Sequence, residues 1–234
     1  MSAAVGLPTR SSDDPLRDWI DEHGKQFNAE RGQDLRELSN AASIFLLSSG
    51  WVLRSRILSD GRDCTTATYV PGDIINLANV VAPQSYDTLV ALTPIETVIV
   101  SDRDLRRASH EDGDIAFSIM RRFLADSHWL REALAAIGQL KAKDRLFFYV
   151  VQTRNRMIAY GSLDRKTTTF PFPLTQLELA QTIGITPVHV NRVLKEHLSE
   201  GVMKIDHRML HILDLAEFEQ RAISTANLLN DGHQ

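Results

Sequence analysis

The sequence holds a single cysteine, Cys64, among 234 residues. One thiol excludes an internal disulfide and any metal cluster that needs several thiolate ligands. No apolar run approaches the roughly 20 residues that a membrane-spanning helix requires. The first residues, MSAAVGLPTRSSDDPL, also lack the apolar stretch of a signal peptide. These absences predict a cytoplasmic protein with no membrane partner.

The common sequence motifs of enzymes are missing too. The chain has no G-x-x-x-x-G-K phosphate loop, no G-x-S-x-G nucleophile turn and no H-E-x-x-H zinc motif. Four histidines near the C-terminus have no Cys neighbour and no acidic partner at a metal-ligand spacing. We interpret them as surface or base-contacting groups: His189, His197, His207 and His211. We therefore expect no enzyme, no catalytic residue, no metal and no cofactor.

Charge is distributed unevenly along the chain. Residues 1–140 hold 14 Lys and Arg against 20 Asp and Glu, and residues 212–234 hold 1 against 4. Between them, residues 141–211 hold 11 against 6, a local net charge of +5 in a chain of net charge −4. Such a basic block predicts a local anionic partner, although a solvated basic surface would account for it equally well.

The stretch LTQLELAQTIGITPVHVNRVLKE, residues 174–196, contains two short helical patterns around one glycine. Thr175 and Glu178 have the spacing of a capping box, which predicts that a first helix begins directly after Thr175. Gly184 can end that helix in a left-handed conformation. Thr186, followed by proline, is a favourable N-cap for a second helix.

The apolar and small residues of this stretch let the two helices pack on each other. Helices this short are unstable alone. All the positions that a helix-turn-helix needs to fill are occupied by suitable side chains: Leu179, Ala180, Ile183, Gly184, Ile185, Val190 and Val193. The pattern predicts a helix-turn-helix, and the alternative is an ordinary helical hairpin.

A second helix of this kind can enter the major groove of DNA. Its outward residues would then reach bases: Val188, His189, Asn191, Arg192 and Lys195. Arginine can make two hydrogen bonds to guanine, asparagine can pair with adenine, and valine can pack on a thymine methyl group. Three further side chains are placed to bond phosphates: Thr175, Gln176 and Thr186.

The residues after the second helix predict a wing. VMKID and MLHILDL read as two strands joined by a tight turn at residues 206–208. Lys204 and Arg208 would lie beside the DNA backbone. LAEFEQRAISTANLL then reads as a final amphipathic helix.

The first half of the chain is rich in strand and turn signals. GWVLRSRIL, CTTATYV, YVPGDIINL and DTLVALTPIETVIVSDRDL are separated or broken at residues 59–62, 71–72 and 93–94. Short strands with regular turns predict a small antiparallel barrel or roll. Residues 15–38 have a weaker helical pattern. Cys64 lies just past the first turn, beside Arg62, and is either an inert strand cysteine or a redox-responsive thiol.

A long helical segment without proline follows, from about Asp112 to Leu140. Alternating four-three spacing marks a heptad seam: Ala116, Met120, Phe123, Ser127, Leu130, Leu134 and Ile137. We predict that its large apolar members form a dimer interface: Met120, Phe123, Leu130, Leu134 and Ile137. The alternative is a single helix packed on its own β domain.

From about Leu35 onward the chain resembles the Crp–Fnr family of bacterial transcription regulators. The resemblance is carried by DGR at 60–62, PGD at 71–73, KAKDRL at 141–146 and PLTQLELAQTIGITPVHVNRVLK at 173–195. The last stretch is the most specific, and its TPVHVNR core is typical of family members from alphaproteobacteria. The resemblance implies a β-roll sensor domain, a long dimerisation helix and a C-terminal winged helix-turn-helix.

The resemblance also assigns roles and partners. Arg192 stands where the family places its guanine-reading arginine, whereas Val188 replaces an acidic base-reading residue found in many members. The family's best-known operator sequences are therefore not carried over to this chain. The partners implied are double-stranded DNA, a second copy of the chain and RNA polymerase.

The sensor positions depart from the pattern of members that bind cyclic AMP. In those members a Glu after the PGD turn holds the ribose, and an Arg about ten residues later neutralises the cyclic phosphate. Here the matching positions are Leu77 and Asp87. Leucine cannot accept a bond from a ribose hydroxyl, and two like charges ~4 Å apart repel by several kcal/mol in a partly buried site. One Cys also excludes the four-cysteine iron–sulfur site of the oxygen-sensing members.

We thus predict an α+β chain in three parts: a β-roll sensor-like domain with an N-terminal helix over residues 1–110, a dimerisation helix over 111–140, and a winged helix-turn-helix domain over 141–234. It would be a DNA-binding transcription regulator that acts as a homodimer on an inverted repeat, with an altered or absent cyclic-nucleotide response and an undefined effector. The alternative is a small-ligand or redox sensor module without a direct DNA role, which would leave the groove-facing Arg192 unexplained.

Overall fold

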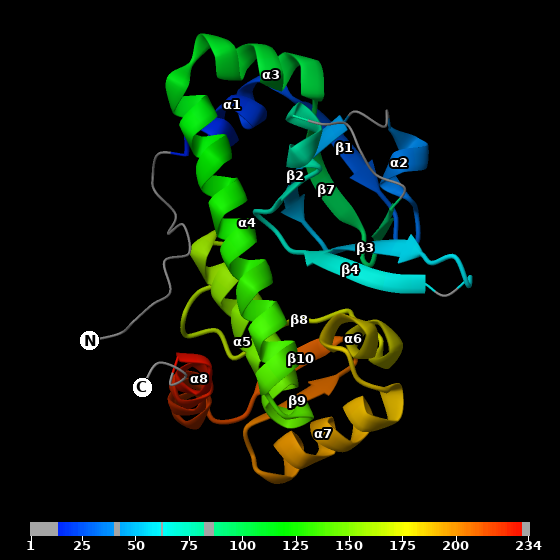
Figure 1. Cartoon of the computed structure of the whole chain (residues 1–234), viewed down its shortest axis with the longest axis vertical. Helices are drawn as coiled ribbons and strands as arrows, with labels where there is room; N and C mark the ends of the chain where they lie inside the picture. The colour runs from blue at the N-terminus through cyan, green and yellow to red at the C-terminus, as the bar shows by residue number, and fades with distance from the viewer. Residues whose placement is uncertain (1–13, 40–42, 62, 82–86, 231–234) are drawn as a thin grey trace. The chain divides into compact units, whose positions relative to one another are not determined.

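The computed structural model describes residues 14–39, 43–61, 63–81 and 87–230. The chain divides into two compact units. Unit 1 comprises residues 1–126 and 159–162, and unit 2 comprises residues 127–158 and 163–234. The architecture is α+β, as predicted: unit 1 is mostly antiparallel β-structure, and unit 2 is mostly helical with one small sheet (Figure 1).

Unit 1 is built on two antiparallel sheets. One has the strand order β1-β7-β2-β5 and the other the order β4-β3-β6. Their strands are β1 (Lys25–Ala29), β2 (Ser43–Ser49), β3 (Val52–Ile57), β4 (Asp63–Tyr69), β5 (Ile74–Ile75), β6 (Thr88–Ala91) and β7 (Ile95–Ser101). The β3–β4 hairpin and the break between β6 and β7 lie where the turn signals predicted them.

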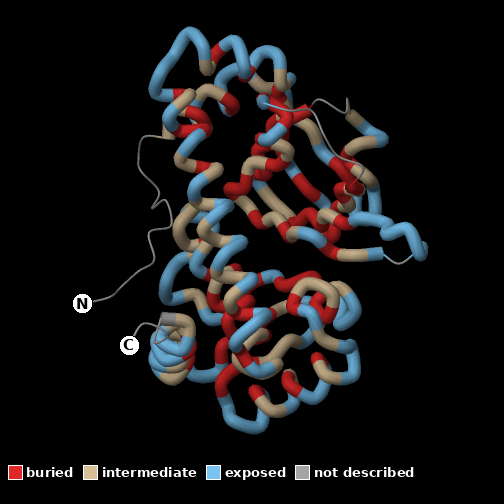
Figure 2. The backbone as a smooth tube through the Cα atoms, viewed as in Figure 1, coloured by how far each residue is buried: buried red, intermediate tan, exposed pale blue. Residues whose placement is uncertain are grey.

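Strand β2 supplies side chains to two apolar clusters. Successive residues of a strand point to opposite faces of its sheet. Ile44 and Leu46 pack with residues of the neighbouring helices, whereas Phe45 and Leu47 pack with residues of the second sheet. All four are almost completely buried. In Figure 2 the buried stretches of unit 1 accordingly follow its strands.

The remaining elements of unit 1 correct two sequence predictions. They are α1 (Pro15–His23), α2 (Leu35–Leu38), the 3₁₀ turn η1 (Leu77–Val80) and α3 (Asp102–Glu111). The helical prediction over residues 15–38 is wrong for β1, an edge strand paired with β7 from Lys25↔Ile99 to Ala29↔Ile95. Residues read as the end of a strand begin α3 instead, because the Ser101 hydroxyl accepts a hydrogen bond from the Asp104 amide (3.0 Å) and caps a helix there.

Helix α4 (Gly113–Gln139) is a single continuous helix, one residue shorter at each end than the segment predicted from the sequence. It follows α3 directly and begins in unit 1. Ile115 and Ile119 bury its first turns against the apolar cluster that includes Leu16, Ile20 and Leu105.

Unit 2 contains the predicted winged helix-turn-helix. Its elements after α4 are α5 (Ala142–Ala159), β8 (Thr169–Pro171), α6 (Gln176–Ile183), α7 (Pro187–Ser199), β9 (Met203–Asp206), β10 (Met209–Ile212) and α8 (Leu215–Asn230). The three strands form one sheet of order β8-β10-β9. Half of the residues of α5 are buried, so this helix supplies a large part of the core of the unit. Among the described residues no helix is long and apolar enough to cross a membrane.

Candidate nucleic-acid interface

Local capping interactions define the ends of α6 and α7. The Thr175 hydroxyl accepts from the Glu178 amide (3.2 Å), and the Glu178 carboxylate accepts from the Thr175 amide (2.6 Å), so the predicted capping box is present. Gly184 follows α6 with a φ of 69°, as its predicted left-handed conformation requires. The Thr186 hydroxyl caps α7 by accepting from the His189 amide (3.3 Å).

The contact between α6 and α7 is apolar and tight. Five of the predicted apolar and small positions have exposures of 2% or less: Leu179, Ala180, Ile183, Val190 and Val193. Ile185, by contrast, is half-buried. Sequence reasoning missed Arg145 of α5, whose guanidinium donates to the carbonyls of Ile183 (3.1 Å) and Gly184 (3.3 Å) and to that of Leu140 (3.0 Å). The last carbonyls of a helix have no partner within the helix and need donors from elsewhere. A basic residue shortly before the helix-turn-helix, such as Arg145, was therefore the signal in the sequence.

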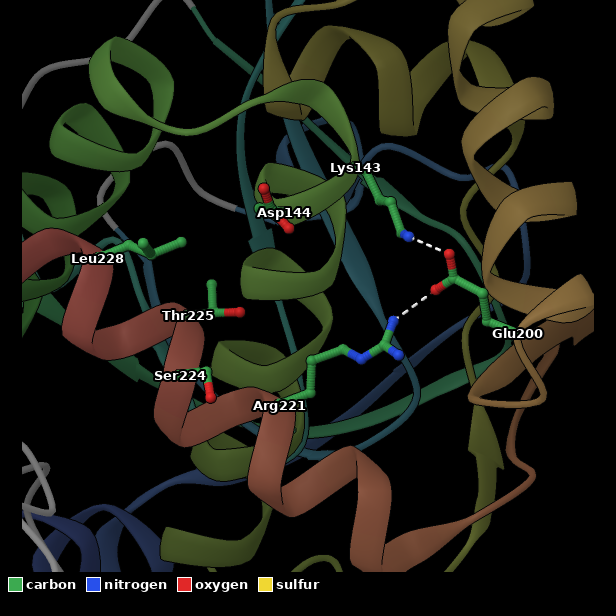
Figure 3. Close-up of a pocket in the computed structure, with 7 residues that line it drawn as sticks. All are labelled: Lys143, Asp144, Glu200, Arg221, Ser224, Thr225 and Leu228. Carbon is green, nitrogen blue, oxygen red and sulfur yellow. Dashed lines mark hydrogen bonds and ion pairs between the residues drawn. The ribbon is translucent and has the colours of Figure 1, made fainter.

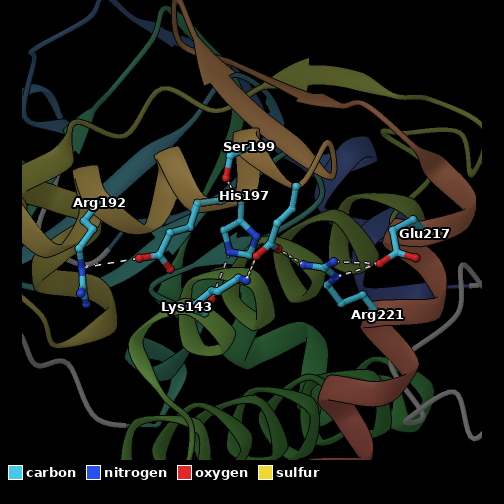
Figure 4. A network of polar contacts seen from close by, with 8 residues as sticks. Lys143, Arg192, His197, Ser199, Glu217 and Arg221 are labelled. Atoms are coloured by element: carbon cyan, nitrogen blue, oxygen red, sulfur yellow. Dashed lines mark hydrogen bonds and ion pairs between the residues drawn. The ribbon is translucent and has the colours of Figure 1, made fainter.

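The outward face of α7 carries the predicted base-contacting residues. Val188 is 82% exposed, Asn191, Arg192 and Lys195 are exposed, and His189 is half-buried. The Arg192 guanidinium contacts His189 Nε2 one turn before it. It also approaches the Glu196 carboxylate one turn after it, with an Nε–Oε1 distance of 3.7 Å (Figure 4).

The residues predicted to bond phosphates lie at the N-terminal ends of the two helices. Thr175, Gln176 and Thr186 are exposed. The two threonine hydroxyl oxygens already accept an amide hydrogen bond each, and a hydroxyl keeps one O–H to donate. The N-terminus of a helix also favours anions, because its free amides carry partial positive charge.

The wing is a two-stranded hairpin in which Asp206 pairs with Met209. The two residues between them, His207 and Arg208, have positive φ angles of 47° and 62°. Arg208 is exposed at the tip, and Lys204 is half-buried on β9. The predicted tight turn is therefore confirmed.

His197 corrects the interpretation of the four histidines. It is 1% exposed on the inner face of α7, so it is a core residue and not a surface or base-contacting group. Its ring stacks on Phe147, and its Nε2 lies 3.3 Å from the Lys143 carbonyl. Burial lowers the pKa of His197 below its ordinary value of 6.5. The other three, His189, His207 and His211, are at least partly exposed.

A charged cluster lies at the C-terminal end of α7. The Glu200 carboxylate contacts Lys143 of α5 and lies 2.5 Å from the Arg221 guanidinium of α8. These two cations lower the pKa of Glu200 to about 2. A cavity of about 370 Å³ is lined by this cluster and by further residues of α5 and α8 (Figure 3). The described residues contain no group of three or more His, Cys, Asp or Glu side chains that could hold a metal ion.

Comparison with known proteins identifies the type of helix-turn-helix domain in unit 2. Residues 145–221 match the family model of the Crp-like helix-turn-helix domain. This part of the chain is therefore a Crp-like helix-turn-helix domain, the DNA-binding domain of a transcription regulator. The chain is 24% identical over 221 residues to the transcriptional regulatory protein btr of Bordetella pertussis, which covers 92% of this chain and 87% of that protein.

Two solved structures share the fold of this chain. FixK2 from Bradyrhizobium japonicum superposes with a TM-score of 0.71 at 17% identity and covers 84% of this chain and 96% of that one. TTHB099 from Thermus thermophilus, a transcriptional regulator of the CRP family, gives a TM-score of 0.63 at 20% identity and covers 85% and 96%. The matched domain and the curated relative btr both belong to transcription regulators, in agreement with the prediction that the chain is not an enzyme.

The two residues predicted to replace nucleotide contacts in unit 1 make contacts within the chain. Leu77 and Asp87 are each 5% exposed. The Asp87 carboxylate accepts from Arg56 Nε at 2.6 Å, and its backbone carbonyl contacts Arg36. Arg54, on the same strand as Arg56, donates to the Asn76 side-chain oxygen (2.6 Å).

Cys64 lies half-buried in β4, directly opposite Arg56 in the register with β3. Arg62, the residue first considered as its activating neighbour, lies outside the described residues. The choice between an inert and a redox-responsive thiol therefore remains a prediction from the sequence.

Helix α4 of the regulator exposes an apolar stripe. Four of the five predicted interface residues are exposed: Met120, Leu130, Leu134 and Ile137. Phe123 is half-buried against the core of unit 1, so part of its ring is already covered. Phe117 and Leu124, which the sequence reasoning did not select, are 56% and 65% exposed and extend the stripe.

Proposed function

We propose that this regulator acts as a homodimer on an inverted-repeat DNA site, which it reads with α7. The observation that carries the proposal is the outward face of α7, on which Arg192 is exposed among Val188, Asn191 and Lys195. A guanidinium can bond guanine O6 and N7 at once in the major groove, which distinguishes a G·C pair from the other pairs. In this scheme Thr175, Gln176, Thr186, Lys204 and Arg208 contact phosphates and fix the register.

The apolar stripe of α4 supports the homodimer. Large apolar side chains exposed in a row along a helix are stabilised when a second helix covers them. A two-fold dimer would present its two α7 helices to successive major grooves on one face of the DNA. The half-sites should then lie roughly 10–11 base pairs apart, centre to centre.

We further propose that the regulator has no cyclic AMP response. Asp87 is buried, and its negative charge lies where a cyclic phosphate would need a positive one. Leu77 offers no acceptor to a ribose hydroxyl. The effector of unit 1, whether a small ligand or a redox signal at Cys64, is a separate question from DNA reading.

Three finer assignments complete the proposal. The functional division into residues 1–110, 111–140 and 141–234 assigns sensing, dimerisation and DNA reading to successive parts of the chain. RNA polymerase would be the partner at the promoter, in the cytoplasm where the chromosome lies. The alphaproteobacterial type is supported by the TPVHVNR sequence of the reading helix.

A randomised-site selection tests the proposed function. Wild-type protein should enrich an inverted repeat, and Arg192→Ala should cost about 1–3 kcal/mol and relax preference at one base pair of each half-site. Arg103→Ala, which removes an exposed arginine of α3, is the matched control and should enrich the wild-type motif. Enrichment of a site without two-fold symmetry, or an unchanged motif with Arg192→Ala, would refute the scheme. If no sequence is enriched at all, the alternative of a sensor module without a DNA role is favoured.

A further inference from the structure

The C-terminal helix α8 forms an ion pair with the carboxylate of Glu200, at the end of the proposed DNA-reading helix α7. Glu200 is the residue directly after α7, and its carboxylate contacts Lys143 at the start of α5 and Arg221 on α8 (Figure 3). The family model ends at residue 221, so the rest of α8 lies beyond the matched domain.

Glu200 occupies an unfavourable place for an acidic residue. The C-terminal end of a helix carries partial negative charge, which repels a carboxylate. Two cations offset this repulsion, and they hold the pKa of Glu200 at about 2, far below its ordinary value of 4.5. The position of Glu200 is therefore explained by its partners on α5 and α8 and not by the stability of α7 alone.

Arg221 is fixed on both sides. Its Nε and one terminal nitrogen donate to the Glu217 carboxylate one turn earlier on α8, at 3.2 and 2.9 Å, while the other terminal nitrogen donates to Glu200 at 2.5 Å (Figure 4). The Arg221 side chain is 28% exposed and that of Glu200 is 36% exposed. Water screens a half-buried pair of this kind only in part.

A second, apolar line of contact joins the same two helices. Phe218 of α8 packs on Phe147 of α5 with ring centroids 4.9 Å apart, and Phe147 stacks on His197 of α7 with centroids 5.6 Å apart. Phe147, Phe218 and His197 are each 1% exposed. The last turn of α7 is thus held by a buried aromatic stack beside the charged cluster.

We propose that Arg221 is a positioning residue of the DNA reader, which sets the orientation of α7 in the major groove by holding Glu200. This inference rests on the proposed reading role of α7. It assigns α8 to the DNA-reading machinery, although α8 carries none of the base-contacting residues. It also implies that the charges of Lys143 and Arg221 are balanced by the carboxylates of Glu200 and Glu217, and that neither cation contacts a phosphate.

Affinity measurements on a double-mutant cycle test the inference. Arg221→Gln and Glu200→Gln should each weaken binding to the selected site about three- to tenfold, and the double variant should be no weaker than either single one, because both remove the same contact. Binding to random DNA and the salt dependence of affinity should match wild type, since no phosphate contact is lost. Gln220→Ala, an exposed neighbour on α8, is the control and should bind as wild type does.

Two further measurements separate positioning from loss of folding. Arg221→Lys keeps the charge and should recover most of the affinity that Arg221→Gln loses. Hydrogen exchange of residues 197–200 in the free protein should be faster in Arg221→Gln than in wild type. Unchanged affinity in Arg221→Gln, multiplicative losses in the double variant, or a salt slope shallower by about one unit would each overturn the inference. If the wild type has no preferred site, the proposed function fails and the inference fails with it.

Discussion

Arg192 meets two side chains of its own helix, His189 one turn before it and Glu196 one turn after it. Both contacts restrict the rotamers of a long side chain that would otherwise lose much freedom on binding a base. Part of the conformational entropy that the Arg192 side chain would lose on binding DNA is therefore already lost in the free protein. Val188, at 82% exposure, offers an apolar side chain alone, so in the proposed scheme it could contact a base only through its methyl groups.

The buried ring of His197 predicts a stability that depends on pH. Its pKa is lowered in the folded state, mainly by burial, so the unfolded chain takes up a proton near pH 6.5 that the folded chain does not. The free energy of unfolding should therefore fall as pH falls below about 6.5, by at most about 1.4 kcal/mol per pH unit from this residue. The charged groups that face the ring are Lys143, Glu200 and Arg221, and their effects on its pKa are smaller than that of burial.

Thermal unfolding between pH 7.5 and 5.5 checks this prediction. The midpoint of the wild type should drop more steeply than that of His197→Gln, while His110→Gln, an exposed histidine of α3, should keep the wild-type slope. Glu200 does not interfere, because its lowered pKa affects stability only below its ordinary value of 4.5. Equal slopes for the wild type and His197→Gln would show that the ring is protonated in the folded state.

At the scale of one helix, the apolar stripe of α4 predicts the oligomeric state. Leu130→Asp combined with Leu134→Asp should give monomers and greatly weaken operator binding, because two desolvated carboxylates per helix oppose pairing. Light scattering should report about twice the chain mass of 26.3 kDa for the wild type and the chain mass for the variant. Ile57→Asp with Leu58→Asp, two exposed apolar residues of unit 1, is the control and should remain dimeric. A wild-type monomer at micromolar concentration would rule the dimer out.

Substitutions in the wing should reduce DNA affinity without changing sequence preference. Lys204→Ala or Arg208→Ala should weaken binding to all sequences alike, and each should make the salt dependence shallower by about one unit of slope. Titrations of specific and random DNA at several salt concentrations measure both effects. Arg103→Ala removes the same charge from α3 and should leave the slope unchanged. A loss confined to the specific site would mean that these side chains read bases.

Sequence reasoning succeeded for elements whose signals are local. The caps of α6 and α7 lie within three residues of the amides that they bond, and the wing turn lies between two short apolar strands. It failed for β1, which exists because Lys25–Ala29 pairs with β7, about 70 residues away along the chain. A five-residue edge strand with one buried residue has too weak an alternation to be recognised alone.

The candidate site likewise contains residues that the sequence predicts and residues that depend on tertiary packing. The outward face of α7 follows from the helical period once the helix is known. The roles of Arg145 and Glu200 depend on how α5, α7 and α8 pack together, and no spacing along the sequence encodes that packing. His197 differs, because it lies seven residues after the buried Val190 and so on the inner face of α7; its polarity nevertheless suggested a surface residue.

For the whole molecule, the contacts of unit 1 predict indifference to cyclic AMP. Calorimetry should detect no binding, because Arg56 is already paired with Asp87, which adds no positive charge for the phosphate, and Leu77 cannot bond the ribose. The affinity for the selected operator should likewise be the same with and without the nucleotide. A cyclic AMP-binding member of the family serves as the positive control. Micromolar binding to this chain would contradict the prediction and would require Asp87 to move or to be protonated.

The turn of the wing is a place where the chain forgoes stability. Two successive residues with positive φ form the kind of turn that favours Asn-Gly, yet the chain has His207 and Arg208 there. A left-handed conformation costs a residue with a side chain roughly 1–2 kcal/mol. Asn-Gly at these positions should raise the midpoint temperature of unfolding. Because the change removes Arg208, it should also lower the affinity for DNA. The wing tip is thus a compromise between a relaxed backbone and the side chains it displays, as expected where a surface is kept for binding.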